Sequence, residues 1–172
     1  MALSMEGEFR KSALYEVAKQ MATAARTAPK ARGTDNLTIA IVDGDDIRRI
    51  ADKMKEMNEP GRGPDFFVRD ANSILQSEVM LLIGTTIDPI GLPHCGLCGF
   101  ENCDEKRKNP KAPCVFNASD LGTATGSAVA VAADARVDNR IMYTVGMATR
   151  ELQILGEAVK IVYGIPLSCS GK

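Results

Sequence analysis

The sequence predicts an α+β fold, with a small mixed sheet flanked by long helices. Apolar residues recur at helical spacing over several long segments, and short apolar runs of strand length lie between them. The 172 residues are 45% apolar and 25% charged, an ordinary globular balance that is enough for one sizeable core. We therefore expect a single domain over residues 1–172, interrupted by an irregular cysteine-rich loop at 85–119.

The first half of the chain is predicted to form three helices and two strands. The elements expected, in order, are a helix over 6–28, a strand over 37–42, a helix over 45–58, a helix over 65–76 and a buried strand over 79–84. Pro29 ends the first helix, because proline disfavours a helical conformation in the residue before it. The glycines and prolines of residues 59–64 predict a loop.

Three further elements are expected after the cysteine-rich loop: a helix over 121–136, a strand over 140–145 and a helix over 149–163. Ser119 or Asp120 is the expected N-cap of the first, while Gly164 and Pro166 are expected to end the last. The helix over 121–136 consists almost wholly of small residues and has little polar face. It is therefore expected to be buried, with other backbones packed closely around it.

Charge and hydropathy exclude some classes of partner. The net charge of −1 gives no attraction to a polyanion, so we expect no nucleic-acid partner. The longest apolar runs are far too short to span a bilayer, so no membrane association is expected. The N-terminus lacks the basic start and apolar stretch of a signal peptide, which predicts a cytoplasmic protein.

Four of the five cysteines lie within a 20-residue window, with the spacing C-x2-C-x4-C-x10-C. They are Cys95, Cys98, Cys103 and Cys114. Clustered cysteines in a reducing compartment indicate metal ligands or redox groups rather than disulfides. A metal would also order a loop that is too long to be ordered by apolar packing alone. The spacing therefore predicts a four-thiolate metal site, while Cys169 is interpreted as an ordinary thiol.

The identity of the metal stays open on spacing alone. Thiolates are soft ligands that suit iron–sulfur clusters and zinc, and buried free thiols are a third interpretation. Zinc sites usually pair two C-x2-C knuckles, whereas only one is present here. Gly96 and Gly99 would let the backbone turn tightly and present N–H groups to cluster sulfides. An iron–sulfur cluster is the favoured interpretation, and a zinc-stabilised structural or interaction protein is an alternative.

The pattern Cys-Gly-x-Cys-Gly-x3-Cys with a later cysteine resembles the small 4Fe–4S module of bacterial electron-transfer and carbon monoxide dehydrogenase proteins. That resemblance implies that all four cysteines bind the cluster. The whole chain also resembles an uncharacterised prokaryotic family that contains a ferredoxin domain. The segments that carry this second resemblance are Arg26–Gly33, Asp120–Gly122, Val137–Tyr143 and Gly164–Ser168.

A further resemblance is to the FMN-dependent nitroreductase fold. It rests on the order of elements around Ala24–Pro29, on the small-residue helix and on the closing Gly-Ile-Pro. It implies a homodimer and an FMN-dependent oxidoreductase as an alternative function. Arg26, Lys30 and Arg32 form a basic group around a glycine loop that would suit the FMN phosphate. The alternative for these three side chains is a solvated surface loop, and no catalytic residue is predicted.

Two surfaces are expected to meet partners. The basic run of Lys106, Arg107, Lys108 and Lys111 lies between two of the predicted ligands. It is interpreted either as a solvated loop or as a docking surface for an acidic redox partner. The small-residue helix over 121–136, or the first helix, is expected to form the interface of a homodimer, because both of its sides need cover.

Overall fold

The computed structural model describes residues 3–58 and 65–170, and the loop predicted at 59–64 lies outside them. A four-stranded sheet has the order β1-β2-β4-β3. Its strands are β1 (Leu37–Asp43), β2 (Val79–Thr85), β3 (Asp138–Asn139) and β4 (Ile161–Ser168). Every neighbouring pair is antiparallel, so the prediction of a mixed sheet is wrong while the α+β class is confirmed.

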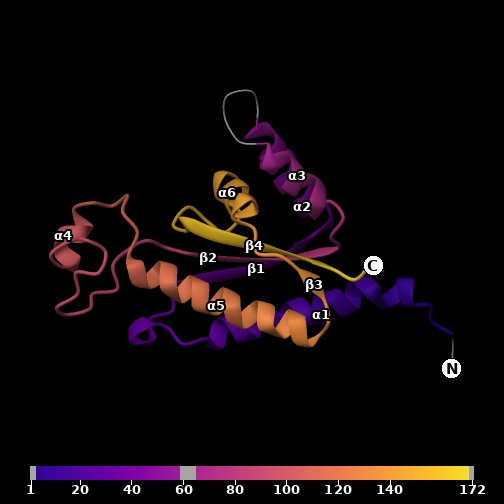
Figure 1. The fold of residues 1–172 in the computed structure, drawn as a ribbon, viewed down its shortest axis with the longest axis horizontal. Coiled ribbons are helices and arrows are strands. Elements are labelled where there is room, and N and C mark those ends of the chain that lie inside the picture. Colours follow the sequence, from indigo (N-terminus) through magenta and orange to yellow (C-terminus); the bar gives the residue numbers. More distant parts are fainter. Residues whose placement is uncertain (1–2, 59–64, 171–172) are drawn as a thin grey trace.

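Helices cover both faces of the sheet (Figure 1). The two long helices α1 (Glu6–Thr27) and α5 (Val115–Asp134) lie on one face. The other face carries α2 (Gly44–Glu56), α3 (Phe66–Ile74) and α6 (Tyr143–Glu151). None of the described helices is both long and apolar enough to cross a bilayer.

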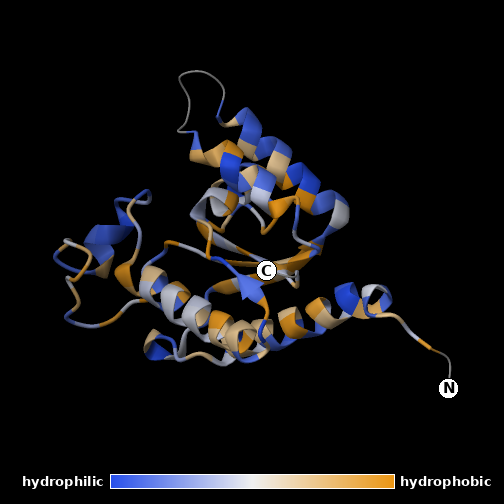
Figure 2. Ribbon diagram, turned by 45° about the vertical axis from the view of Figure 1, so that its right-hand side comes forward, coloured by the Kyte–Doolittle hydropathy of each residue, from blue (hydrophilic) through white to orange (hydrophobic). Residues whose placement is uncertain are grey.

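Strand β2 is buried along its whole length because successive side chains enter different cores. Val79, Leu81 and Ile83 pack with α1 and α5, whereas Met80 and Leu82 pack with α2, α3 and α6. This explains its continuous apolar run, since a strand covered on both faces has no polar side. The long strands of the sheet are accordingly mostly hydrophobic in Figure 2, while the short strand β3 and α4 (Cys103–Arg107) are hydrophilic.

Helix α5 was predicted to be buried, and the structure shows that one side of it is. Ala124, Ala128 and Ala132 are fully buried against α1 and the sheet. Gly122 and Gly126 are exposed on its other side, so this face of the helix meets solvent. The helix also begins at Val115, several residues before the predicted caps Ser119 and Asp120, because the chain turns from extended to helical at Cys114.

The last third of the chain differs most from the prediction. Residues 140–145 are not a strand: Met142 makes one bridge to Gly164, and α6 begins at the next residue. The helix predicted at 149–163 is also wrong, because α6 ends at Glu151 and the chain returns as β4. Gly164 and Pro166 lie inside that strand instead of ending a helix. Gly164 is required there, because a methyl group would overlap the side chain of Val145.

Candidate metal centre

The four predicted ligands lie on one segment that leaves the sheet after β2 and returns at α5. Its only described helix is α4, and the segment extends beyond the end of α5, away from the sheet (Figure 1). We call residues 86–114 the cysteine loop. Cys103 is the first residue of α4, and Cys114 immediately precedes α5. Two of the four positions are therefore fixed by helix ends.

Hydrogen bonds hold the base of the cysteine loop. The carbonyl oxygen of Ile87 accepts from the Cys114 backbone N–H at 3.1 Å and from the Lys106 ammonium at 2.7 Å. One residue further on, the Asp88 carbonyl oxygen accepts from the Asn117 side-chain amide at 2.7 Å. The beginning of the loop is thereby joined to its end and to the first turns of α5.

The two C-terminal ligands have defined surroundings. Asn102 caps α4, since its side chain accepts from the N–H groups of Asp104 and Glu105. The Cys103 Sγ lies 3.9 Å from the Leu92 carbonyl oxygen, and Cys114 is only 5% exposed. The position of Cys103 follows from the local sequence, because the preceding Asn102 is a strong N-cap and so fixes where α4 begins.

The N-terminal pair lies in a tighter turn. Cys95 and Cys98 are half-buried, and the N–H of Gly99 donates to the Gly96 carbonyl oxygen at 3.0 Å. Gly99 has a φ of 87°, as its glycine allows, whereas Gly96 is not among the positive-φ glycines. A Cβ at Gly96 would instead come within 3.0 Å of the Phe100 carbonyl oxygen, so close backbone approach is what requires that glycine.

Among the described residues, no three His, Cys, Asp or Glu side chains are grouped closely enough to hold a metal ion. The structure brings the four cysteines onto one loop but does not converge their sulfur atoms. Cys169 stands apart from them, because it is exposed and directly follows β4. The C-terminal end of the chain lies on the opposite side of the molecule from α4 (Figure 1).

Lys106 is the feature of this site that the sequence analysis missed. Its side chain is 1% exposed, although it was grouped with a surface-exposed basic run. Its neighbours on α4 do face solvent, where Arg107 pairs with Asp104 and Lys108 pairs with Glu105 at 2.9 Å. The helical period could have separated them, because Lys106 follows Cys103 by three residues and so shares its face of the helix.

The three basic residues predicted to bind a phosphate have other partners. Lys30 donates to the carbonyl oxygens of Ala25, Arg26 and Ala28, which engages all three ammonium protons at the end of α1. Arg26 pairs with Asp35 at 2.7 Å and also donates to the Leu37 carbonyl oxygen. These contacts close the turn from α1 to β1.

Asp35 is electrostatically coupled to this turn. Burial raises the pKa of its carboxyl group, but the Arg26 hydrogen bond, the Leu37 N–H and the charges of Arg26 and Lys30 lower it, and the net pKa is below the ordinary value. The carboxylate therefore stays ionised over the neutral range. The charge of Arg26 is balanced by this partner before any phosphate arrives.

Arg32 ties the same turn to the cysteine loop. It lies in a short 3-10 helix, Ala31–Gly33, with a φ of 60°, and its guanidinium donates to the carbonyl oxygens of Ile90 and Gly91 at 3.3 and 2.9 Å. The Ala31 N–H donates to both oxygens of the Asp120 carboxylate, at 3.1 Å each. The basic turn thus bridges the cysteine loop and α5.

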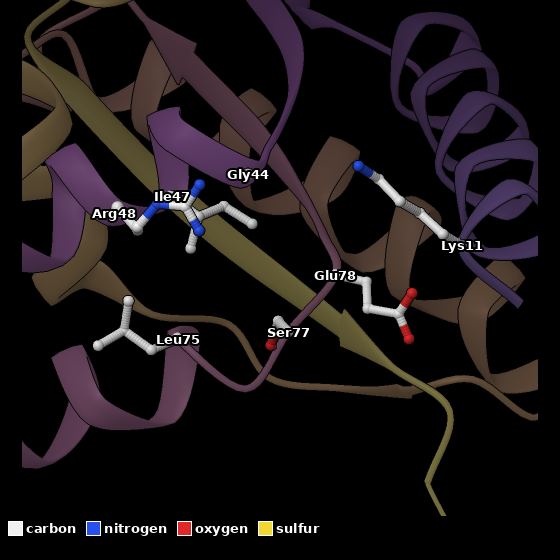
Figure 3. Close-up of a pocket in the computed structure, with 7 residues that line it drawn as sticks. All are labelled: Lys11, Gly44, Ile47, Arg48, Leu75, Ser77 and Glu78. Atoms are coloured by element: carbon white, nitrogen blue, oxygen red, sulfur yellow. The ribbon is translucent and has the colours of Figure 1, made fainter. Parts of the chain in front are cut away.

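One pocket lies away from the cysteine loop, and another lies on the loop itself. One of about 230 Å³ is lined by Lys11, Ile47, Leu75 and Glu78, among others (Figure 3). It lies where β1 ends and β2 begins, whereas the cysteine loop leaves the other end of β2. No cysteine or histidine lines it. A second pocket, of about 430 Å³, lies on the cysteine loop between Phe100 and the exposed Lys108 and Lys111.

The fold places the protein in the class of nitroreductase-like structures. A nitroreductase with bound FMN from Desulfitobacterium hafniense matches 91% of this chain and 78% of its own length, with a TM-score of 0.62 and 13% identity. A nitroreductase family protein from Clostridium novyi matches 98% of this chain and 76% of its own, with a TM-score of 0.61 and 12% identity. Identity this low shows the shared fold alone.

The sequence comparisons name the family. An uncharacterized protein from Archaeoglobus fulgidus is 42% identical over 174 aligned residues, covering 97% of this chain and 92% of the relative. The model of the family described as "uncharacterized protein containing a ferredoxin domain" matches residues 111–172. The chain belongs to this family of ferredoxin-domain proteins, as its sequence resemblance indicated. The matched segment includes Cys114 but not the other three predicted ligands.

Proposed function

We propose that the protein binds a 4Fe–4S cluster through Cys95, Cys98, Cys103 and Cys114 and serves in electron transfer. The observation that carries this proposal is the placement of the cysteines. Four of the five lie on one loop that is hydrogen-bonded at its base, and the fifth lies outside this loop, exposed just after β4. When bound, the cluster would supply one-electron oxidation and reduction.

The donor set suits this group. Four thiolates are a ligand set that iron–sulfur clusters take. The residues of the loop would bind and shield the cluster. Cys103 at the start of α4 and Cys114 just before α5 would bind it together with Cys95 and Cys98.

Metal analysis of protein purified without oxygen tests this proposal. We expect a brown protein with about four iron and four sulfide per chain. Cys98→Ser should abolish or severely reduce iron binding, while the matched change Cys169→Ser should leave the iron content unaltered. A colourless protein with one zinc per chain would instead support the zinc-stabilised alternative. Equal iron loss in both variants would show that the four ligands are wrongly assigned.

Flavin binding is a second candidate function, because the fold is shared with a nitroreductase described with bound FMN. The protein would then be an FMN-dependent oxidoreductase, and the cluster would pass electrons to the flavin. Arg26 and Arg32 retain donors for a phosphate, whereas the ammonium of Lys30 is fully engaged. Titration of added FMN, followed by its fluorescence, tests this candidate. No quenching at micromolar protein would remove it.

A redox partner and a homodimer complete the proposal. Lys108 and Lys111 are exposed on the cysteine loop, where an acidic partner protein would approach the cluster. For the dimer, the exposed side of α5 offers small residues over which a second copy could pack closely. Electron transfer to such a partner should slow as ionic strength rises, because salt screens exposed charges.

A further inference from the structure

We propose that Lys106 is the internal counter-ion of the cluster and that its buried charge sets the reduction potential of the cluster. This inference rests on the proposed function, since it assigns a role to a residue beside the same site. It begins from a physical mismatch. A full positive charge is buried to 1% exposure in the one loop that carries four cysteines.

The hydrogen bonds of Lys106 do not satisfy it. An ammonium has three protons to donate, and in the described part of the chain Lys106 has one acceptor, the Ile87 carbonyl oxygen at 2.7 Å. None of the ion pairs among the described residues includes it. Burying an unpaired charge is expensive, so lysines are rarely buried without an anionic partner. The metal-free loop therefore retains a cation that its own carboxylates do not balance.

Carboxylates on the same helix are directed elsewhere. Asp104 pairs with Arg107 and Glu105 pairs with Lys108, both at the surface. Two of the predicted ligands are linked to Lys106 by position and by a shared hydrogen-bond acceptor. Cys103 lies three residues before Lys106, on the same side of α4. Cys114 shares an acceptor with it, because the Ile87 carbonyl oxygen receives both the Lys106 ammonium and the Cys114 N–H.

A bound iron–sulfur centre would supply the negative charge that Lys106 lacks as a partner. A four-thiolate iron–sulfur centre is anionic, and taking up one electron from a redox partner makes it more so. No proton or co-reactant is needed for that step. A fixed buried cation stabilises the reduced state more than the oxidised state, so it raises the reduction potential. Lys106 would therefore act as a positioning and charge-balancing residue, and it need not touch the iron.

A purely structural role predicts something different. If Lys106 only anchors the loop to Ile87, any hydrogen-bond donor of similar length should replace it, and its charge should not matter. Lys106→Gln keeps a donor without the charge, Lys106→Met keeps only the length, and Lys106→Arg keeps the charge. Lys108→Met is the matched control, because it removes one solvent-exposed charge from the residue that directly follows α4.

The test measures two properties of each variant. In anaerobically purified protein, spectroelectrochemical titration should give lower potentials for both Lys106→Gln and Lys106→Met, a nearly unchanged potential for Lys106→Arg, and little shift for Lys108→Met. Roughly 10- to 100-fold weaker retention of iron against a chelator is expected for Lys106→Met, as for other residues that support metal ligands. In metal-free protein, Lys106→Met should unfold at the same or a higher temperature, because an unbalanced buried charge has been removed.

The outcomes separate the two proposals. If the wild type holds a cluster but the potential does not change in Lys106→Gln and Lys106→Met, the counter-ion is rejected while cluster binding stands. A lower unfolding temperature of the metal-free Lys106→Met protein, restored by Lys106→Gln, would show that Lys106 is only a structural anchor. If the wild type holds no iron after anaerobic purification, the proposed function fails and the counter-ion fails with it.

Discussion

Asn117 should be the residue that most strongly holds the cysteine loop to the rest of the protein. Its side chain is 1% exposed. Its amide nitrogen donates to the Asp88 carbonyl oxygen at 2.7 Å, and its amide oxygen accepts from the Asn36 side chain at 2.9 Å. The loop, α5 and the start of β1 therefore meet at one side chain. Asn117→Ala removes both hydrogen bonds and leaves their partners to find others.

The size of the effect follows from those two bonds. Each partner left unsatisfied in a partly buried place costs about 1–3 kcal/mol, so we expect the loss of two bonds in Asn117→Ala to lower the free energy of unfolding by roughly 2–6 kcal/mol. Asn117→Asp keeps the acceptor for Asn36 but loses the donor to Asp88, and its cost should be intermediate. Asn109→Ala is the matched control. It removes one exposed bond, to the Glu105 carbonyl oxygen, and should cost no more than about 0.5 kcal/mol.

Urea unfolding of the metal-free variants, followed by circular dichroism, measures these differences. Linear extrapolation gives the free energy of unfolding, and an unchanged slope confirms that the same surface is exposed on unfolding. Limited proteolysis should at the same time cut the cysteine loop of Asn117→Ala faster than that of the wild type. If Asn117→Ala and Asn109→Ala proved equally stable, the reasoning that this network fixes the loop before metal binds would be refuted.

Three further outcomes follow from other parts of the fold. Gly146→Ala should destabilise the protein by about 2 kcal/mol or more in thermal unfolding, because its methyl would overlap the Val162 carbonyl oxygen, whereas Gly122→Ala meets no described atom within 4 Å and should stabilise by about 0.5 kcal/mol. Asp35→Asn should lower stability near pH 7, and this difference should shrink as the pH falls below the ordinary carboxyl value of 3.8, because a carboxyl whose folded pKa is lowered stabilises only while ionised; urea midpoints at neutral and at acidic pH check this. Light scattering should give about twice the 18.4 kDa chain mass, and the exposed change Gly126→Glu should halve it with the fold retained; a wild-type mass near 18.4 kDa would reject the dimer.

Local patterns predicted the first half of the fold well because each element there carries its own signal. Pro29 follows the end of α1 closely, and the run at 79–84 became the central strand β2. Periodicity misled in the last third of the chain for a physical reason. Val159 and Val162 are both buried three residues apart, a spacing typical of a helix, although only Val162 lies in β4. Only long-range pairing of Ile161–Ser168 with β2 selects the strand.

At the candidate site too, spacing along the chain could be predicted from the sequence, whereas contacts between distant segments could not. The spacing of four cysteines was visible in the sequence, and the structure places all four on one loop. The burial of Lys106 was not visible, because its neighbours are also basic and only the orientation of α4 separates them. The partners of Arg32 were likewise beyond reach, since Ile90 and Gly91 are nearly 60 residues away in the chain.

The two cofactors predicted from the sequence are not independent in this structure. Arg32 was predicted to bind a flavin phosphate, yet its guanidinium holds the carbonyl oxygens of Ile90 and Gly91, just before Cys95. A phosphate that took this guanidinium would compete with the cysteine loop for it. Flavin binding would therefore loosen the loop that carries the predicted cluster, unless the phosphate used the remaining donors of Arg32 without displacing the two carbonyl oxygens. If the proposed flavin phosphate and the cysteine loop do share Arg32, occupancy of either cofactor should alter the affinity for the other, and by the same factor in each direction.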